Sequence, residues 1–447
     1  MPQTLPLIAR YDAAAPLLWR REGVLTAGEF LGQVLVLAAA LPAAPYLVNL
    51  CEERGNFLVA WCAAAVRGQT NLLPASRAPQ VIAAARAGVG ASHLIDDEAV
   101  RRALAAGRAR RPAHAPRIPA DHIMQVGFTS GSTGMPTAHA KRWGSLQFNT
   151  RYNAERIREC LLASDAVAGM PGIVATVPPQ HMYGTETSVL LPLLAGMAVH
   201  ADRPLFAGDV AAALSQVPAP RVLVTTPVHL RTLLASGHAL PVPGVVVSAT
   251  APMDAQLARS VAAQWHAPLL EMFGSTETCV IATRLTAAET DWRLYPGVTV
   301  DPAADHTWVR APWFDQPNLL QDVVEIPAPG RMLLRGRNVD MIEIAGKRAS
   351  LSDLTRRLLA IAGVQDAVVF QPADGEAAAQ GVARVHRVAA AVVAPHLSEQ
   401  AILSALAQGV DPVFLPRPLL RLPQLPRNEL GKTSREQLLR LLRHAPG

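Results

Sequence analysis

The chain has 447 residues, of which 50% are hydrophobic and 17% charged, a composition that supports large cores and excludes an intrinsically disordered chain. Its length predicts about three structural units. The formal net charge is +6, but the basic residues come in twos and threes without aromatic side chains between them. This distribution argues against nucleic-acid binding.

No segment has the length and apolar character of a membrane span. The longest uncharged stretch near the N-terminus, 30–51, is interrupted by Pro42, Pro45 and Asn49, whereas a spanning helix needs ~20 continuous apolar residues. The first residues lack the charged and apolar regions of a signal peptide. The four cysteines form no CxxC pair. We therefore expect a reduced, cytoplasmic protein without a membrane span.

Helical and strand patterns alternate through the N-terminal part of the chain. Apolar residues at helical spacing predict helices that begin at Ala27 and Gly55 and a third helix over 78–88. Short apolar runs over 45–50 and 91–97 predict buried strands. Strands that alternate with helices are typical of a doubly wound α/β domain.

The middle of the chain adds three apolar runs that each end in small or polar residues. These runs are 220–227, 243–252 and 267–275. In open parallel sheets, ligands bind beyond the carboxyl ends of the strands. We therefore expect the three carboxyl ends to lie at one edge of a sheet and to form part of a ligand site.

The pattern changes after Leu294, where proline and glycine become frequent and the strands look antiparallel. From about residue 338, a strand, a loop and a helix are followed by two strands that could pair and an amphipathic helix. The expected fold is α/β. A large N-terminal domain, 1–336, contains doubly wound sheets and a small β-rich subdomain, and a small α+β C-terminal domain covers 337–447.

The clearest motif is GFTSGSTGMPTAHAKRW, over 127–143, which follows an apolar strand. Small residues let backbone N–H groups converge on an anion, and hydroxyl groups add donors. The motif is not a Walker A loop, which would need a Gly-Lys-Ser/Thr ending that opens a helix. It predicts a phosphate-binding loop made of Thr129, Ser130, Gly131, Ser132, Thr133 and Gly134.

The segment TSGSTGMP resembles the phosphate loop of the adenylate-forming superfamily, which includes acyl- and aryl-CoA synthetases and peptide adenylation domains. That family usually has lysine directly after the proline, where this chain has Thr137. Lys141 follows four residues later, and only three of the 41 basic residues are lysine. Either Lys141 takes over the phosphate contact or the loop manages without a lysine. The scarcity of lysine favours the first alternative.

Two further segments resemble family motifs in the same order. VPPQHMYGTE is similar to the segment that lines the acid pocket, and the resemblance assigns His181, Tyr183 and Gly184 to that pocket. SATAPM, over 248–253, occupies the place of the turn that contacts adenine. Thr250 stands there in place of a usual glycine, so the β-branched side chain restricts a close backbone approach to adenine.

MFGSTET, over 272–278, resembles the aromatic-Gly-x-Thr-Glu motif. By this resemblance Phe273 stacks on adenine, Thr276 contacts the α-phosphate and Glu277 holds Mg²⁺. A flat ring suits a base, a hydroxyl suits an oxyanion and a carboxylate suits a hard cation. Later in the chain, Asp322 matches the aspartate that binds both ribose hydroxyls, and Arg337 matches the arginine that reaches ribose and phosphate.

The C-terminal segment PRNELGKTSR is similar to the family's lysine loop, and Lys432 is the matching lysine. In the family this lysine lies on a small mobile domain that swings between two half-reactions, and it closes over the acid and the α-phosphate. The hinge segment departs from the family pattern because Val339 stands at the usual acidic or lysine position. Domain rotation is expected, but the pivot residue is not defined.

The resemblance covers most of the chain and implies an AMP-forming acid–thiol ligase that uses ATP and Mg²⁺. A closer similarity is to the ligases of aryl polyene and xanthomonadin-type pigment pathways, which load a hydroxybenzoic acid onto an acyl carrier protein. The expected partners are therefore a small carboxylic acid and an acyl carrier protein. One alternative is an aryl- or fatty acyl-CoA ligase that uses free CoA. A non-catalytic nucleotide sensor is disfavoured because Lys432, Asp322 and Glu277 are all present.

Overall fold

A computed structural model of the chain describes residues 3–74, 77–130, 136–163, 169–303, 306–320, 322–337, 341–344, 347–372, 388–427, 433 and 435–443. The chain divides into two compact units. The first contains Met1–Ala249, Val261–Leu285 and Pro312–Asp315, and the second contains Thr250–Ser260, Thr286–Ala311 and Gln316–Gly447. The expected domain boundary between residues 336 and 337 stays a prediction.

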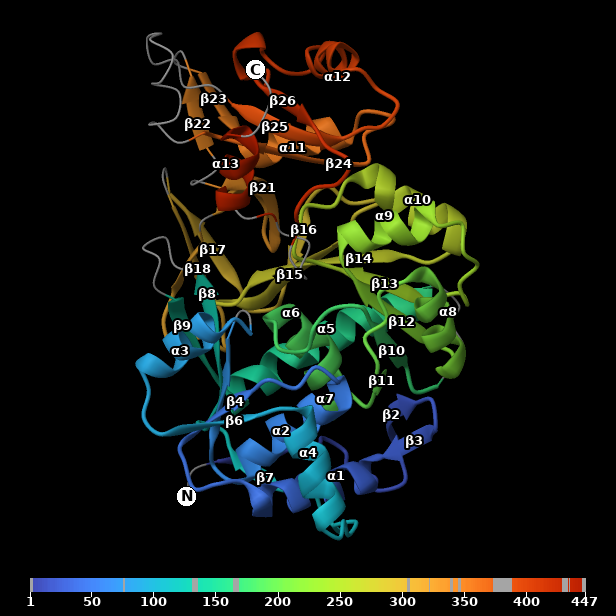
Figure 1. Cartoon of the computed structure of the whole chain (residues 1–447), viewed down its shortest axis with the longest axis vertical. Helices are drawn as coiled ribbons and strands as arrows, with labels where there is room; N and C mark the ends of the chain where they lie inside the picture. Colours follow the sequence, from blue (N-terminus) through green and yellow to red (C-terminus); the bar gives the residue numbers. More distant parts are fainter. Residues whose placement is uncertain are drawn as a thin grey trace. The chain divides into compact units, whose positions relative to one another are not determined.

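The first unit is built around two sheets (Figure 1). One is a five-stranded sheet with the order β6-β4-β5-β8-β9, in which β4, β5, β6 and β8 are parallel and β9 returns antiparallel to β8. Its strands are β4 (Tyr46–Asn49), β5 (Thr70–Leu73), β6 (Ser92–Ile95), β8 (Ile123–Ser130) and β9 (Pro136–Arg142). Strand β9 thus brings the chain back from the predicted phosphate loop along β8.

The second sheet of this unit has the order β15-β14-β13-β12-β10-β11-β2-β3. Strands β12, β13 and β14 are parallel neighbours, so their carboxyl ends lie at one edge, as the sequence predicted. The bounds are β2 (Pro16–Arg20), β3 (Gly23–Thr26), β10 (Gly172–Ala175), β11 (Ala198–His200), β12 (Arg221–Thr225), β13 (Val245–Ser248), β14 (Leu269–Ser275) and β15 (Cys279–Leu285); β1 (Thr4–Pro6) and β7 (Arg117–Pro119) form a separate pair.

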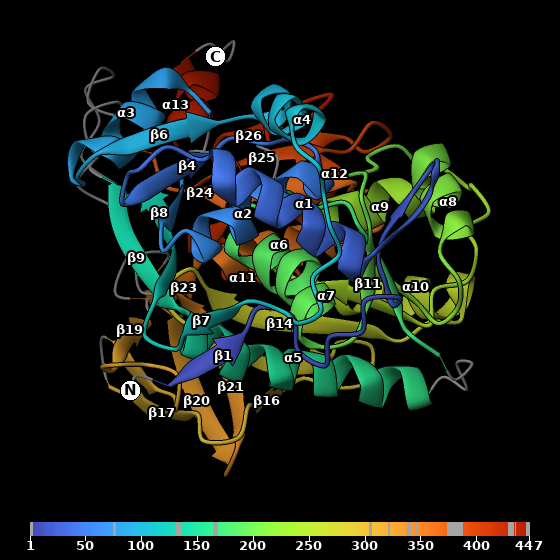
Figure 2. The same cartoon turned by 90° about the horizontal axis from the view of Figure 1, so that it is seen from below.

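Helices cover these sheets, and α1 and α2 lie side by side in Figure 2. Helix α2 is buried on almost every face because its small residues let neighbouring elements approach from several directions. The helices are α1 (Ala27–Ala40), α2 (Arg54–Val66), α3 (Pro79–Ala87), α4 (Asp97–Ala106), α5 (Trp143–Ala163), α6 (Met182–Thr185), the π-helix η1 (Glu186–Leu190), α7 (Leu191–Leu194), α8 (Ala207–Gln216) and α9 (Pro227–Ala235). The residues of α10 (Ala255–Trp265) are divided between the two units.

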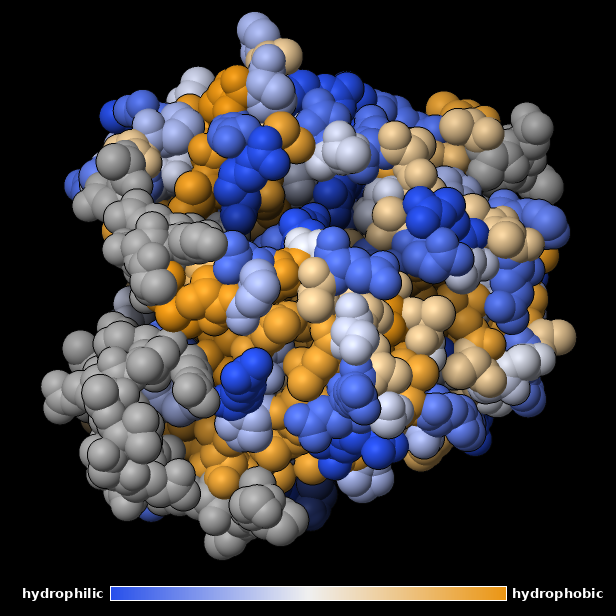
Figure 3. Space-filling model, turned by 90° about the horizontal axis from the view of Figure 1, so that it is seen from above, coloured by the Kyte–Doolittle hydropathy of each residue, from blue (hydrophilic) through white to orange (hydrophobic). Residues whose placement is uncertain are grey.

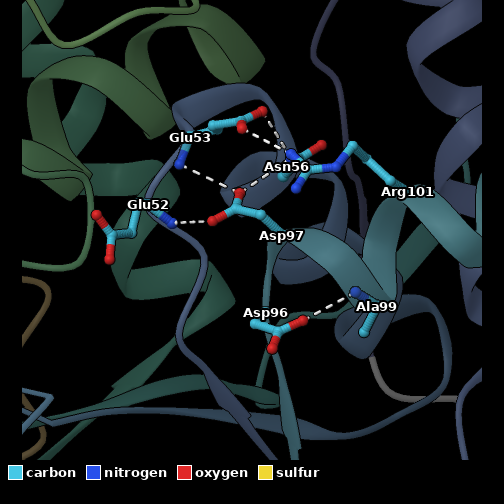
Figure 4. A network of polar contacts seen from close by, with 7 residues as sticks. All are labelled: Glu52, Glu53, Asn56, Asp96, Asp97, Ala99 and Arg101. Carbon is cyan, nitrogen blue, oxygen red and sulfur yellow. Dashed lines mark hydrogen bonds and ion pairs between the residues drawn. The ribbon is translucent and has the colours of Figure 1, made fainter.

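The N-terminus of α2 is fixed by polar contacts with the start of α4 (Figure 4). The Asp97 carboxylate accepts hydrogen bonds from the backbone N–H groups of Glu52 (2.7 Å) and Glu53 (3.2 Å). The N-cap residue Glu53 makes no side-chain cap of its own, so Asp97 supplies an anion to this helix end from another helix.

The second unit contains the expected antiparallel strands. Its elements are β16 (Trp292–Leu294), β17 (Thr299–Pro302), β18 (Thr307–Arg310), β19 (Asn318–Leu320), β20 (Asp322–Ala328), β21 (Arg331–Arg337), β22 (Met341–Ile344), β23 (Lys347–Ser350), α11 (Leu351–Leu359), β24 (Asp366–Phe370), β25 (Ala389–Val393), α12 (Glu399–Leu406), the 3₁₀ helix η4 (Pro412–Phe414), β26 (Leu419–Arg421) and α13 (Arg435–Arg443).

The C-terminal sheet β24-β25-β26 has apolar residues on both faces. Alternate residues such as Val369 and Val392 join a core with α11 and α12, whereas Phe370 and Val393 pack with Leu438 of α13. The period of two along each strand explains this division. The observed α/β architecture, with its large N-terminal part, confirms the expected fold class.

No helix among the described residues is long and apolar enough to cross a membrane. On the face drawn in Figure 3, hydrophilic residues lie between several groups of hydrophobic residues. The four cysteines, all among the described residues, are buried and not joined in disulfides.

Candidate active site

The predicted phosphate loop joins β8 to β9. Residues 131–135, which include Gly131, Ser132, Thr133 and Gly134, lie outside the described part of the chain, and the side chains of Thr129 and Ser130 are not described. The backbone register pairs Thr129 with Thr137 and Ser130 with Pro136. Gly127 in β8 lies close to Thr276, which belongs to another predicted site motif. A Cβ atom on Gly127 would lie 3.0 Å from Cγ2 of Thr276. The strand that leads into the loop therefore passes against Thr276.

The segment that carries Thr276 and Glu277 is a tight turn between β14 and β15. The backbone N–H of Ser275 donates to the Thr278 hydroxyl (3.0 Å), and the N–H of Thr278 donates to the Ser275 hydroxyl (3.3 Å). Cys279 closes the turn in the left-handed region, with φ of 58°. These contacts place Thr276 and Glu277 at the tip of the hairpin.

Lys141 reaches this hairpin from β9. Its ammonium donates to the backbone carbonyl of Glu277 (2.5 Å), and the residue is only 8% exposed. The sequence predicted that Lys141 lies at the phosphate site. The structure brings it to the predicted metal-binding turn, where it contacts the Glu277 carbonyl and the Cys279 side chain.

His139, also on β9, lies beside the Glu277 side chain. Its Nε2 atom is 3.3 Å from Oε1 of Glu277. Burial lowers the pKa of His139, so the imidazole is neutral near pH 7 and the contact is a hydrogen bond rather than an ion pair. Sequence reasoning missed His139, although it lies two residues from Lys141 in the same strand.

The Glu277 carboxylate stays ionised although it is partly buried. Burial raises its pKa, but a hydrogen bond with Ser275 and the charge of Lys141 act in the opposite direction, and the net shift is downward. Among the described residues, no three His, Cys, Asp or Glu side chains cluster to hold a metal. One ionised carboxylate suits Mg²⁺, which usually takes one or two carboxylates together with substrate phosphates and water.

The predicted acid-pocket residues lie on one short segment before and within α6. His181 precedes this helix at its N-cap position. Tyr183 is buried, and its hydroxyl donates to the carbonyls of Thr225 (3.1 Å) and Val247 (3.0 Å), at the ends of β12 and β13. A Cβ atom on Gly184 would lie 1.9 Å from the Pro178 carbonyl oxygen, so only glycine fits there.

A polar chain that the sequence did not reveal lies at the same sheet edge. The Thr176 hydroxyl donates to the Thr225 hydroxyl (2.9 Å), and Nδ1 of His229 is 2.8 Å from the Thr176 oxygen. Because Tyr183 also binds Thr225, the predicted acid-pocket segment and this chain share one strand end. Burial lowers the pKa of His229, which keeps its ring neutral.

Phe273, Asp322 and Arg337 are the residues that the sequence predicted to bind adenine and ribose. Phe273 lies near the end of β14, and Asp322 begins β20, where its backbone pairs with that of Arg337. The side chain of Arg337 is not described, and Lys432 lies outside the described residues. Thr250 has φ of 81°, so the backbone here keeps a conformation that favours glycine, despite the β-branched side chain.

Comparisons with known proteins agree with these motifs. The family model described as AMP-binding enzyme matches residues 46–339. The chain is 28% identical over 312 residues to a 4-coumarate–CoA ligase of Halorhodospira halophila, covering 68% of this chain and 73% of that protein. It is 31% identical over 240 residues to a 4-coumarate–CoA ligase of Rhodobacter capsulatus, covering 53% of this chain and 58% of that protein.

The fold also matches solved structures. The crystal structure of ATP-bound MatB from Rhodopseudomonas palustris superposes with a TM-score of 0.77 at 17% identity, covering 97% of each chain. At this identity the match supports the fold alone. The family match, which spans most of the chain, carries the assignment: the protein belongs to the AMP-binding enzyme family and is an AMP-forming acid–thiol ligase.

Proposed function

We propose that the protein activates a hydroxybenzoic acid with ATP and transfers the acyl group to the phosphopantetheine thiol of an acyl carrier protein. An acid oxygen attacks the α-phosphorus of ATP, and the bond to the bridging oxygen breaks and releases pyrophosphate. The thiolate sulfur then attacks the acyl carbon of acyl-AMP, and AMP leaves. The relatives named 4-coumarate–CoA ligase support an aryl acid as substrate.

One observation carries the adenylation half of this proposal. The hairpin tip with Thr276 and Glu277 lies against β8, the strand that leads toward the predicted phosphate loop. The evidence is that Gly127 of β8 approaches the Thr276 side chain closely. A hydroxyl, a carboxylate and the strand that leads toward the glycine-rich segment thus lie together, which supports a site for a polyphosphate and its cation.

We assign the following roles within this reaction. The segment Thr129–Gly134 and Lys141 bind phosphate, and Phe273 stacks on adenine. Asp322 binds the ribose hydroxyls and Arg337 reaches ribose and phosphate. His181, Tyr183 and Gly184 shape the acid pocket. Thr276 contacts the α-phosphate, and Lys432 bridges acid and phosphate in the transition state. Glu277 would hold Mg²⁺, which neutralises phosphate charge when bound.

The acceptor is the second part of the proposal. Carrier proteins are typically acidic, and this chain is basic, with arginines such as Arg356, Arg357, Arg417 and Arg421 in its C-terminal part. Three of these arginines already have partners within the chain. Arg356 and Arg357 both form ion pairs with Asp353, and Arg421 donates to the Ala394 carbonyl. The net charge of the chain, more than any single arginine, supports docking of an acidic carrier.

Pyrophosphate release across a panel of benzoic, hydroxybenzoic, cinnamic and fatty acids tests the substrate, with CoA and carrier protein as separate acceptors. We expect the fastest release with a hydroxybenzoic acid, and thioester formed on the carrier protein at a rate that falls with salt. Efficient transfer to free CoA that does not respond to salt would favour the alternative, an aryl- or fatty acyl-CoA ligase.

A further inference from the structure

The backbone of the hairpin around Glu277 is bound by side chains from four other segments. Lys141 of β9 donates to the Glu277 carbonyl (2.5 Å), and the Trp313 indole donates to the Thr278 carbonyl (3.0 Å). Two residues further on, at Val280 in β15, Glu186 of η1 accepts from the backbone N–H (2.9 Å). Asn149 of α5 donates to the backbone carbonyl of the same residue (2.7 Å). Both backbone groups of Val280 are therefore held by side chains.

The hairpin needs these partners because its strand pairing is irregular. The register between β14 and β15 shifts between Phe273 and Gly274, and the pair after the shift is Gly274 with Val280. Cys279, next to Val280, has a left-handed backbone, which is costly for a residue other than glycine. A Cβ atom on Gly274 would lie 2.1 Å from the Cys279 carbonyl oxygen, so the two strands approach closely here. Buried backbone groups at such a bulge require other hydrogen-bond partners.

Two of the partners are buried ionisable groups, whose charged forms are expensive to keep in a protein interior. Glu186 is 2% exposed and Lys141 is 8% exposed. The Glu186 carboxylate also accepts from Asn153 (3.4 Å), and Asn153 donates to Asn149 (3.3 Å), which closes a ring of contacts around Val280. Burial raises the pKa of Glu186 to about 7, and the nearby positive charge of Lys141 acts against this rise. An ammonium and a carboxyl group thus bind one hairpin at two points.

We propose that Lys141 and Glu186 are positioning residues that fix the Ser275–Val280 hairpin and thereby aim Thr276 and Glu277 at the reacting phosphate and its cation. This inference rests on the proposed function, in which Thr276 and Glu277 act on MgATP. Lys141 then contributes through the backbone of Glu277 in addition to its contact with phosphate. Glu186 continues the helix that carries Tyr183, so the acid-pocket segment and the hairpin share a rigid connection.

Kinetics of pyrophosphate release test the proposal on Lys141→Met and Glu186→Ala, on the conservative Lys141→Arg and Glu186→Gln, and on the Lys141→Met/Glu186→Ala double variant. Since a misplacement of about 1 Å can cost ~100-fold, we expect kcat to fall by about 10- to 100-fold in Lys141→Met and in Glu186→Ala. Lys141→Arg and Glu186→Gln keep a donor and an acceptor and should recover much of this loss. The double variant should lose much less than the product of the two single effects, because both act through one hairpin.

Thr150→Val is the matched control. Thr150 is buried on α5 one residue from Asn149, and its hydroxyl donates to the Leu146 carbonyl of the same helix (2.6 Å). It should leave kcat unchanged. Hydrogen exchange of the peptide that covers 275–283 gives a second readout, and it should quicken in Glu186→Gln and Lys141→Arg even where the stronger variants fail to fold.

Two results would overturn the positioning role. One is wild-type kcat and wild-type hairpin exchange in every variant of Glu186 and Lys141. The other is an effect confined to Lys141 variants and to the KM for MgATP, which would confine the role of the ammonium to phosphate. A wild-type protein that releases no pyrophosphate with any acid would instead contradict the proposed function, so the two failures are distinguishable.

Discussion

Arg54 offers the sharpest test of how the first unit is held together. It lies in the first turn of α2, and its guanidinium is fully buried. Its Nη1 atom donates to the carbonyls of His200 (3.0 Å) and Asp202 (2.7 Å), and Nη2 donates to those of Ala175 and Val177 (both 2.9 Å). One side chain therefore joins α2 to the segments at the ends of β10 and β11. Burial lowers the pKa of Arg54 to about 9, which still leaves it charged at neutral pH.

The magnitude follows from these four bonds. A hydrogen bond with a charged partner contributes about 1.5–3 kcal/mol net, so a simple sum over four bonds would be about 6–12 kcal/mol. Desolvation of the buried guanidinium opposes this sum, and removal of one partner of a buried charged contact typically costs about 3–5 kcal/mol. We expect Arg54→Met to lose about 3–5 kcal/mol of unfolding free energy, a large share of the usual 5–15 kcal/mol or so.

Urea unfolding followed by tryptophan fluorescence measures this loss. With an m-value of about 3 kcal/mol/M, the midpoint should fall by about 1–1.7 M while m stays constant. The matched control is Arg101→Met, which removes an exposed arginine that pairs with Glu53 (2.7 Å) and should cost at most about 1 kcal/mol. If Arg54→Met and Arg101→Met shifted the midpoint equally, the role given to the four carbonyl contacts would be wrong.

Three further predictions concern single side chains. Lys432→Ala should lower the rate of acyl-AMP formation at least about 100-fold while ATP binding is retained, because the Lys432 ammonium acts in the transition state. A wild-type rate in single-turnover kinetics would contradict this role. Asp322→Ala should weaken ATP binding by about 10- to 100-fold in calorimetry, since each charge-assisted ribose contact contributes about 1.5–3 kcal/mol at most; unchanged affinity would move the ribose site elsewhere. Burial raises the pKa of Glu186 from 4.5 to about 7, so the folded protein binds the extra proton in this window and its stability falls as the pH rises through it. Against Glu186→Gln, the wild type should lose about 3 kcal/mol between pH 4.5 and 8, and a constant difference in urea unfolding would refute that shift.

Much of the fold was predictable because its core strands have simple patterns. The runs that became β12, β13 and β14 are bounded by prolines, glycines and polar residues, and they are buried almost throughout. The helix expected from Ala27 begins there, with Thr26 and Glu29 forming a capping box. The helix expected from Gly55 begins at Arg54, because the backbone before it is set by Asp97, a residue distant in sequence.

The site was only partly predictable. Motif order indicated Thr276 and Glu277, and β8 indeed passes against Thr276. The sequence could not show that Lys141 would also bind the backbone carbonyl of Glu277, since this depends on how β9 faces the β14–β15 hairpin. Glu186 had one available signal, a lone carboxylate within the otherwise uncharged run 182–194. Trp313 had none, because its contact with Thr278 joins residues 35 apart, with four strands between them in the chain.

Product analysis of a single reaction tests the central claim most directly. The purified protein is incubated with MgATP, a hydroxybenzoic acid and carrier protein, and its nucleotide and phosphate products are separated and quantified. Acid activation through acyl-AMP predicts AMP and pyrophosphate in equal amounts, formed only when the acid is present, and one thioester for each AMP released. Formation of ADP and inorganic phosphate, or of AMP at the same rate without any acid, would contradict it.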